Sequence, residues 1–540
     1  MNSNDKRRYG WMDIRFAEWS GRIKKSEKTA FLSAFVSGML AHLYIYTNTI
    51  PNFDGISRVY EEQQMTISGR WFLHYASWLH GFTQMPMVIG ILSMLFLSAA
   101  AALIIRIFRI ESNIVSGIWG CMSVTFPAVA YTNTYTFTAS AYSLAIFLAV
   151  AGLWITKSKK WGIAVGVCLL ALSMGTYQVY AACTITLSVL LVFRDLLEGK
   201  KQTKEIFLSG IHSILYISLG TIIYYIILKI FLWAKDLQLL SYLGMDEVAG
   251  SYPFNRFSEI LAETYRGVWD MFLGTAGGFG EGDLLVLHIL LVVVCGALLV
   301  ILIKRNKVYE KPVHLAGLIF MIILLPAAVN FGQIMSPLSI VSPIMKYAFV
   351  YLYFLPLLLL EMSAEKRGDL RAVKGVYALT LAAVLFCSAY YWQYGNLLYT
   401  MLNQAHRATL SYASNLLSRI ESCEGYKYGM DVVIVGTFPD DRYYTEVEGY
   451  GKVEQGGALS SSVIPLNKHI YYYLQDWLNV PVDEPKEAVF LMVTNLEEFR
   501  DMPLYPDDGS VRIMNGCVVV KVQENYTPRA QYEKDYEQRR

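Results

Sequence analysis

Long apolar runs alternate with short polar segments along the first three quarters of the chain. A helix needs roughly 20 mostly apolar residues to cross the hydrocarbon core of a bilayer. The pattern therefore predicts a mainly α-helical, polytopic membrane protein with about eleven transmembrane helices. The expected spans are residues 29–50, 86–105, 113–130, 137–155, 161–177, 179–193, 206–233, 284–303, 313–332, 344–361 and 372–393. The fifth and sixth are separated only by Gly175-Thr176-Tyr177-Gln178 and form either two spans or a re-entrant hairpin.

The pattern changes after residue 393, where the apolar runs become short and are bounded by Gly, Pro and Asp, as in water-soluble domains. The elements expected there are a helix at 397–421, buried strands at Val432–Val435 and Val489–Val493, a short helix or turn at Leu496–Phe499, and a hairpin of Val511–Ile513 with Val518–Val522 around Asn515-Gly516. These elements predict a small α/β domain with a structural or acceptor-binding role. It contains no phosphate-binding loop, zinc-ligand spacing or nucleophile elbow.

The first 28 residues predict a cytoplasmic amphipathic segment. Met12, Phe16, Trp19 and Ile23 recur at helical spacing among basic residues, as expected for a helix on the inner membrane surface. It serves there as a juxtamembrane anchor or as a site for a regulatory partner. The predicted domains are therefore residues 1–28, a transmembrane domain at 29–393 with outer loops 51–85 and 234–283, and an extracytoplasmic α/β domain at 394–540.

Lysine and arginine in the short loops indicate the orientation, because cytoplasmic loops carry an excess of these residues. With the N-terminus inside, every inside loop is basic and the outer loops hold few basic residues. The inside loops contain Arg106 and Arg109; Lys157, Lys159 and Lys160; Arg194, Lys200, Lys201 and Lys204; Lys304, Arg305, Lys307 and Lys311; and Lys366, Arg367, Arg371 and Lys374. The alternation predicts a multi-pass protein of the plasma membrane with a cytoplasmic N-terminus and an extracytoplasmic C-terminal domain.

The composition agrees with a membrane protein. Of 540 residues, 54% are hydrophobic and only 17% are charged, and the mean hydropathy is +0.36, which soluble proteins of this length do not normally show. The net charge is +2 and the basic residues are scattered, which argues against a nucleic-acid partner. No cofactor is expected, and metal dependence is left open because no ligand cluster stands out.

Five of the seven cysteines lie in apolar runs, where cysteine acts as a small hydrophobic residue. The other two, Cys423 and Cys517, lie in the tail. They can pair if the tail faces an oxidising compartment, and the sequence leaves that pairing open.

The first outer loop concentrates carboxylates and guanidinium groups near the membrane surface, with Asp54, Arg58, Glu61, Glu62 and Arg70. In sugar transfer from a lipid phosphate, a carboxylate takes the proton of the acceptor hydroxyl and cations stabilise the departing phosphate. Asp54 is the candidate base, and Arg58 and Arg70 are candidates for holding the phosphate, because a guanidinium matches phosphate bidentately. The charge pattern also fits a solvated loop anchored to lipid headgroups, and by itself it favours that interpretation.

Lys346 lies at the outer end of the apolar span Pro343–Leu360, where a buried charge costs roughly 2.5–3.5 kcal/mol. It binds a lipid phosphate or extends to the outer headgroups. Tyr177 and Gln178 are candidates for binding sugar hydroxyls, although a tyrosine at an interface is more often part of an aromatic belt. Trp71 and His74 in the first outer loop are further candidates for binding the sugar or the acceptor.

Several motifs occur in a characteristic order: Asn52-Phe53-Asp54, Ser68-Gly69-Arg70-Trp71, Gly175-Thr176-Tyr177-Gln178, and Ser418-Arg419-Ile420-Glu421 followed by Val432-Val433-Ile434-Val435-Gly436. In this order the chain resembles the Gtr type-two family of bacterial glucosyltransferases that modify O-antigen and related surface polysaccharides. The resemblance implies a GT-C-like fold, a polyprenyl-phosphate-linked sugar donor and a catalytic carboxylate at Asp54. Gly55 departs from the acidic or polar residue that the family often has there, so Glu61 and Glu62 remain alternative bases.

The prediction is a membrane glycosyltransferase, a glucosyltransferase by resemblance, that moves a sugar from a polyprenyl-phosphate carrier to a cell-surface glycan. Its partners are then the lipid-linked sugar, the glycan acceptor and membrane lipids. The alternative is a flippase, transporter or polymerase component for lipid-linked sugars or polysaccharides. Such a protein is expected to carry ionisable groups deep in several spans, whereas charges here gather in the outer loop. A structural or sensory role is the third option.

Overall fold

The computed structural model describes residues 21, 23–56, 66–81, 83–159, 161–239, 253–274, 279, 282–337, 341–364, 370–436, 453, 462–464 and 467–524. The chain divides into two compact units. The first contains the described residues before 49, those between 66 and 398, and Val453. The second contains those from 49 to 56 and the remaining ones from 399 onward. The predicted amphipathic segment at 1–28 lies mostly outside the described residues.

Within the described ranges, nine helical segments are long and apolar enough to cross a membrane. Five are single helices: α5 (Pro86–Phe108), α8 (Thr136–Ser158), α11 (Thr203–Ala234), α14 (Leu285–Arg305) and α15 (Pro312–Val329). Three are composite: α6 (Asn113–Thr125) with α7 (Pro127–Thr134), η4 (Gln178–Tyr180) with α10 (Ala181–Glu198), and η7 (Pro343–Val350) with α17 (Tyr351–Ala364). The ninth lies in α18 (Leu370–Glu421). The structure confirms a mainly helical membrane fold but not the count of eleven.

The two other expected spans form helices that are too short to be counted as spans. The first is broken into α2 (Lys25–Ala41) and α3 (Leu43–Thr47) at His42. The fifth is α9 (Gly162–Thr176), which has 15 residues. The run at Gly175–Gln178 therefore separates two distinct helices.

His42, at the break between α2 and α3, bonds to the end of the facing helix. The carbonyls in the last turn of a helix lack partners within it, and α6 ends at Thr125, just before Pro127. The buried His42 ring bonds through Nε2 to the carbonyl of Val124, at 2.9 Å. The side chain at the break in one helix thus supplies a partner for the end of another.

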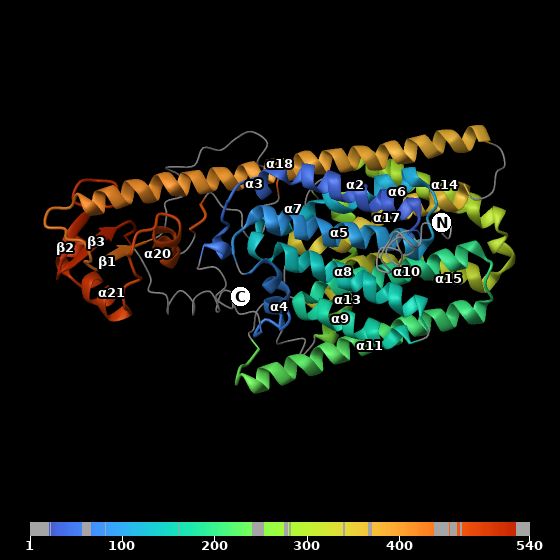
Figure 1. Ribbon diagram of the computed structural model, residues 1–540, viewed down its shortest axis with the longest axis horizontal. Helices are drawn as coiled ribbons and strands as arrows, with labels where there is room; N and C mark the ends of the chain where they lie inside the picture. The colour runs from blue at the N-terminus through green and yellow to red at the C-terminus, as the bar shows by residue number, and fades with distance from the viewer. Residues whose placement is uncertain are drawn as a thin grey trace, which may run out of the picture. The chain divides into compact units, whose positions relative to one another are not determined.

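The long helices of the first unit lie side by side with similar directions (Figure 1). α2 packs against α5 and α6 through small buried residues spaced mostly four apart, Ala30, Ala34, Gly38 and Ala41, as is usual where membrane helices approach closely. α8 packs against α5 and α9, and α10 packs against α15. The first half of α18 contacts α6 and α17 through the pairs Thr125–Ser388 and Tyr353–Tyr391.

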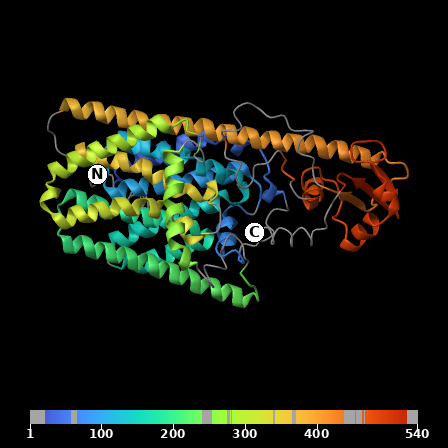
Figure 2. The same cartoon turned by 180° about the vertical axis from the view of Figure 1, so that it is seen from behind.

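Short helices connect the long ones: η2 (Phe53–Gly55), α4 (Leu73–Ser77), η3 (Trp78–His80), η5 (Phe254–Arg256), η6 (Val308–Glu310) and α16 (Phe331–Met335). Part of the long outer loop forms α13 (Phe257–Phe272). α13 runs across the long helices rather than alongside them (Figure 2). Its Ile260, Thr264 and Met271 are buried and Trp269 is exposed, so α13 is an amphipathic helix.

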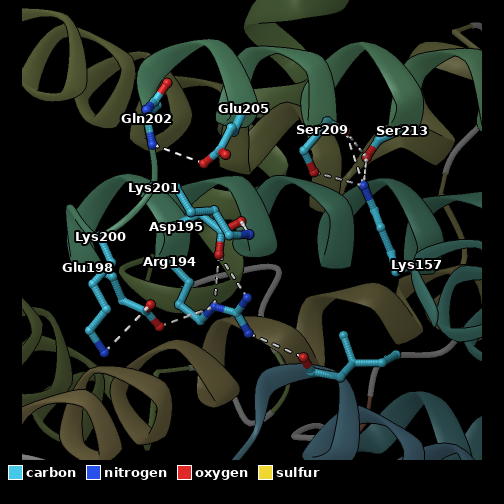
Figure 3. A network of polar contacts seen from close by, with 11 residues as sticks. Lys157, Arg194, Asp195, Glu198, Lys200, Lys201, Gln202, Glu205, Ser209 and Ser213 are labelled. Carbon is cyan, nitrogen blue, oxygen red and sulfur yellow. Dashed lines mark hydrogen bonds and ion pairs between the residues drawn. The ribbon is translucent and has the colours of Figure 1, made fainter.

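Buried charges tie the helices together at one end of this unit (Figure 3). The side chains of Arg194 and Asp195 are both buried, and the guanidinium donates to the carboxylate at 2.8 Å. Arg194 Nη1 also donates to the carbonyl of Ile107, at 3.2 Å, and Lys201 bonds to the other oxygen of Asp195. Breaking such a buried pair leaves a charge unpaired and typically costs about 3–5 kcal/mol, so this network fixes α10 against the end of α5.

Other basic loops join the same end. Arg106 pairs with Glu27 at 2.6 Å, Lys157 donates to Ser213 at 2.8 Å, and Lys311 donates to the carbonyl of Gly199 at 2.7 Å. The structure therefore gathers at one end the loops that the sequence assigns to the cytoplasm. The cytoplasmic location of this end stays a prediction.

The second unit contains a three-stranded sheet with the order β1-β3-β2. β1 (Val432–Val435) pairs in parallel with β3 (Cys517–Lys521), which pairs antiparallel with β2 (Val511–Met514). Asn515 and Gly516 both have positive φ, 48° and 81°, as the predicted two-residue hairpin turn requires. The predicted strand at Val432–Val435 and the hairpin are confirmed.

Three helices pack with this sheet: α20 (Asn467–Asp476), α21 (Glu487–Thr494) and α22 (Glu497–Arg500). The Tyr471 hydroxyl of α20 accepts a hydrogen bond from Ile434 N at 2.8 Å, which covers the edge of β1. The predicted strand at Val489–Val493 is wrong, because this run lies in α21 and buries Phe490 and Val493, three residues apart, against the sheet. A short apolar run does not distinguish a strand from a buried helix. Cys423 and Cys517 are both free.

Lys521 provides a test of how the second unit is stabilised. Its buried ammonium donates to the carbonyls of Arg500 and Met502, at 2.8 and 2.9 Å, at the end of α22. Lys521→Met leaves both carbonyls without this donor, so we expect the sheet to lose about 1–3 kcal/mol of stability. Amide hydrogen exchange of β2 and β3 in the full chain measures the loss. Lys427→Met, at an exposed lysine, should change nothing, and equal exchange in both variants would contradict the assignment.

Candidate functional site

The Ser68–Trp71 segment of the first outer loop packs directly against the break between α9 and α10. The backbone N–H of Phe72 donates to the carbonyl of Gly175 at 2.7 Å. A turn precedes this contact, in which Gly69 N donates to the carbonyl of Thr66, and Gly69 has a φ of 80° that favours glycine. This contact brings together two segments about 100 residues apart in the chain, Ser68–Trp71 and Gly175–Gln178. Both were selected from the sequence.

Trp71 anchors the loop through its ring. The indole is buried and lies near-parallel to the rings of Tyr224 and Phe231 of α11, with centroids 6.5 and 5.8 Å apart. Its other neighbour is Gly175, where a Cβ would lie 2.6 Å from the indole. The absence of a side chain at Gly175 therefore provides the space in which Trp71 packs.

Gln178 fixes the backbone of the same loop. Its buried side-chain amide donates to the carbonyl of Ser68 at 2.9 Å and to the Tyr224 hydroxyl at 3.0 Å. That hydroxyl donates in turn to the carbonyl of Gly69, at 3.1 Å. These contacts give Gln178 a positioning role, and its binding of a sugar stays a prediction.

The loop held in this way presents Arg70 to a group of tyrosines. The Arg70 guanidinium lies 4.7 Å from the centre of the Tyr177 ring, and its Nη1 donates to the Tyr142 hydroxyl at 3.2 Å. The Tyr142 and Tyr177 rings are stacked 4.8 Å apart, and Tyr180 meets both edge-on. A cation over an aromatic face gains about 0.5–2 kcal/mol, so this arrangement restricts Arg70 to one orientation.

A second cation lies on η7, which packs against η4 and α7. Lys346 is partly exposed, and its Nζ lies 5.6 Å from the centre of the Phe279 ring. Phe279 is buried among aromatic residues, where the Tyr131 and Tyr394 hydroxyls share a hydrogen bond of 2.9 Å. Of the cations predicted to bind phosphate, the structure describes Arg70 and Lys346. Both lie on segments that border η4.

Asp54 lies in the second unit, and its local geometry is described by itself. It is partly exposed and forms the middle of η2. Asn52 caps this turn, since its side-chain oxygen accepts the N–H of Gly55 at 2.8 Å. The Asn-x-Asp motif thus has a local physical reason: the asparagine fixes the turn that carries the aspartate.

The remaining predicted residues have different outcomes. Arg58, Glu61 and Glu62 lie outside the described residues. His74 is partly exposed on α4 and its ring meets Tyr75 edge-on. Nearby in sequence, burial lowers the pKa of His80 below its usual value, so this imidazole is neutral at pH 7 and adds no charge to the region.

Sequence reasoning missed two tyrosines of this group, namely Tyr142, which bonds to Arg70, and Tyr180, which packs on Tyr142 and Tyr177. Tyr142 and Tyr180 lie within apolar spans, where tyrosine resembles any other aromatic residue of a core. The signal available was the recurrence of tyrosine near the ends of neighbouring spans, at Tyr131, Tyr142 and Tyr177.

The described site offers two cations, Arg70 and Lys346, and several aromatic rings. Guanidinium and ammonium groups suit phosphate, and amphipathic aromatic rings present both an apolar face and a polar handle. Among the described side chains, no three His, Cys, Asp or Glu residues form a group that could hold a metal ion. The arrangement is suited to binding a phosphorylated, partly apolar ligand.

A protein-family model described as Glucosyl transferase GtrII matches residues 43–360, more than half of the chain. The match includes Asp54, both segments of the contact between Arg70 and Tyr177, and Lys346. No curated protein and no solved structure matches the chain.

Gly175 tests whether its contact with Trp71 holds the loop. Gly175→Val places side-chain atoms where the indole lies, and overpacking of this kind costs about 1–3 kcal/mol. We expect amide exchange of residues 66–78 to become roughly 10- to 100-fold faster. Gly210→Val is the matched control, because no atom lies within 4 Å of a Cβ at that helical glycine. Equal protection of the loop in both variants would contradict the role of Gly175.

Proposed function

Because the chain belongs to the GtrII glucosyl transferase family, we propose that it moves glucose from a polyprenyl-phosphate carrier to a cell-envelope polysaccharide on the outer face of the membrane. The family and the apolar helices make it a membrane glycosyltransferase. The donor, the acceptor and the side of the membrane are parts of the proposal.

The orientation of Arg70 carries the proposal for the donor. A lipid-linked sugar leaves its carrier as a phosphate, so negative charge develops on the phosphate oxygens in the transition state. Arg70 is held on Tyr177 and by Tyr142 before any ligand binds. Such preorganised charge stabilises the leaving group without reorganisation during the reaction.

Lys346 is the second phosphate ligand of the proposal. Its ammonium lies at the start of the span Pro343–Ala364, against Phe279. A carrier phosphate at headgroup depth carries the opposite charge, and a lysine ammonium binds phosphate as a point charge.

Asp54 is the proposed base. The acceptor hydroxyl oxygen attacks the anomeric carbon while the bond from this carbon to the phosphate oxygen breaks. The electron pair of that bond leaves with the carrier phosphate, and the hydroxyl proton passes to the Asp54 carboxylate. The capped turn of η2 orients this carboxylate locally.

The outer-face location is supported by the distribution of charge. The basic loops that cytoplasmic segments are expected to carry gather at one end of the first unit, as Arg106, Lys157 and Lys311 do. The first outer loop and the start of η7 connect the opposite ends of their helices. Donor binding there occurs on the extracytoplasmic side.

The replacement of Asp54 tests the chemistry. Asp54→Asn keeps the size and much of the hydrogen bonding but removes the proton-accepting charge, so turnover should fall roughly 10²- to 10⁴-fold. Binding of the donor should stay nearly unchanged. The assay supplies purified protein with polyprenyl-phosphate glucose and candidate glycans and follows release of the carrier phosphate.

Glu61→Gln and Glu62→Gln are the internal comparisons. If one of these glutamine variants loses turnover while Asp54→Asn retains it, the glutamate replaced in that variant is the base. Absence of turnover by the unmodified protein with every lipid-linked donor would contradict the proposed reaction and favour transport.

A further inference from the structure

Helix α11 lies at the edge of the first unit in both views (Figure 1, Figure 2) and carries one stripe of buried residues. Much of its surface is exposed, including Ile222, Tyr225 and Ile226. From residue 213 onward its buried residues are spaced three or four apart, which places them on one face of the helix: Ser213, Tyr216, Gly220, Tyr224, Leu228 and Leu232. This stripe is the face by which α11 meets the rest of the unit.

The partner of this face is α9, and Gly220 allows the two helices to approach closely. α11 packs against α9, and a Cβ on Gly220 would lie 2.6 Å from Leu170 Cδ2 of that helix. Small residues are usual where membrane helices approach in this way. Tyr224 follows one turn after Gly220 in the same stripe. Its side chain reaches the residues that follow the end of α9 at Thr176.

The Tyr224 hydroxyl bridges the first outer loop and the break after α9. It donates to the carbonyl of Gly69 at 3.1 Å and accepts from the Gln178 amide at 3.0 Å. Gly69 directly precedes Arg70 in the chain. Gln178 directly follows Tyr177, whose ring lies under the Arg70 guanidinium. One hydroxyl is therefore bonded to the neighbours of both members of this cation–π pair.

The Tyr224 ring contacts the residue on the other side of Arg70. Trp71 directly follows Arg70, and its buried indole lies near-parallel to the Tyr224 ring with centroids 6.5 Å apart. Phe231 of α11 packs on the same indole, at 5.8 Å. Through its hydroxyl and its ring, Tyr224 thus contacts both chain neighbours of Arg70.

We propose that Tyr224 is a positioning residue that sets Arg70 over Tyr177 for binding of the carrier phosphate. The inference rests on the proposed function and adds a residue of α11 to the donor site. The Tyr224 hydroxyl donates and accepts within the protein, so it acts on the phosphate through Arg70. A cation held in place before the ligand arrives binds without the cost of ordering its loop.

The test is a double-mutant cycle on the affinity for polyprenyl monophosphate. The full protein in phosphatidylcholine nanodiscs is titrated with this lipid, and Tyr224→Phe is combined with Arg70→Gln. Tyr224→Phe removes the hydroxyl and keeps the ring that packs on Trp71. Tyr216→Phe is the matched control, because it removes a buried hydroxyl from the same stripe about two turns from Tyr224.

We expect Tyr224→Phe to weaken binding roughly 5- to 20-fold, because the loop and the break lose the hydroxyl that joins them. In the Arg70→Gln background the same replacement should change the affinity less than about twofold, since no guanidinium is left to position. Tyr216→Phe should bind as tightly as the unmodified protein. Amide exchange of residues 66–78 should be faster in Tyr224→Phe than in Tyr216→Phe.

Two results would overturn the inference. Unchanged affinity of Tyr224→Phe would remove Tyr224 from the donor site. An equal loss of affinity in both backgrounds would show that Tyr224 acts independently of Arg70, through the fold or by direct contact with the lipid. A failure of the proposed donor site has a different signature, because Arg70→Gln alone would then bind as tightly as the unmodified protein, and the inference would fall with it.

Discussion

The packing of Trp71 against the break between α9 and α10 is the contact on which the site depends. The indole requires the space left by Gly175, and the backbone of Phe72 bonds to the carbonyl exposed there. Gln178 then holds the carbonyl of Ser68 from the other side of the break. Arg70, between these anchors, acquires one orientation over Tyr177. A loop that leaves the membrane is thereby fixed to the bundle, as a binding group on a loop requires.

The charged side chains at the two ends of the first unit have different partners. One end uses charge to join helices, and the buried pair of Arg194 and Asp195 is satisfied by its own neighbours. At the site, the cations Arg70 and Lys346 contact aromatic rings. The proposed donor site lies at this second group, where Tyr142 and Tyr177 orient Arg70.

Much of the fold could be predicted because membrane spans and tight turns have local signatures. Apolar length located the nine helical segments in the described part of the chain that are long enough to cross a membrane, and Asn515-Gly516 located the hairpin. The contact of His42 with the carbonyl of Val124 could not be predicted, since it joins two different helices. In the site, Arg70 and Tyr177 could be selected from their motifs, but their mutual contact and the role of Tyr142 arise only when distant spans pack.

The most direct test of this account is the affinity of Arg70 variants for polyprenyl monophosphate. A hydrogen bond to a charged group contributes about 1.5–3 kcal/mol, so Arg70→Gln should weaken binding roughly 10- to 100-fold. Arg70→Lys, which keeps the charge but loses the planar fork, should lie between this variant and the unmodified protein. The protection of residues 66–78 from amide exchange shows whether the loop stays in place. Unchanged affinity of Arg70→Gln with an intact loop would contradict the account.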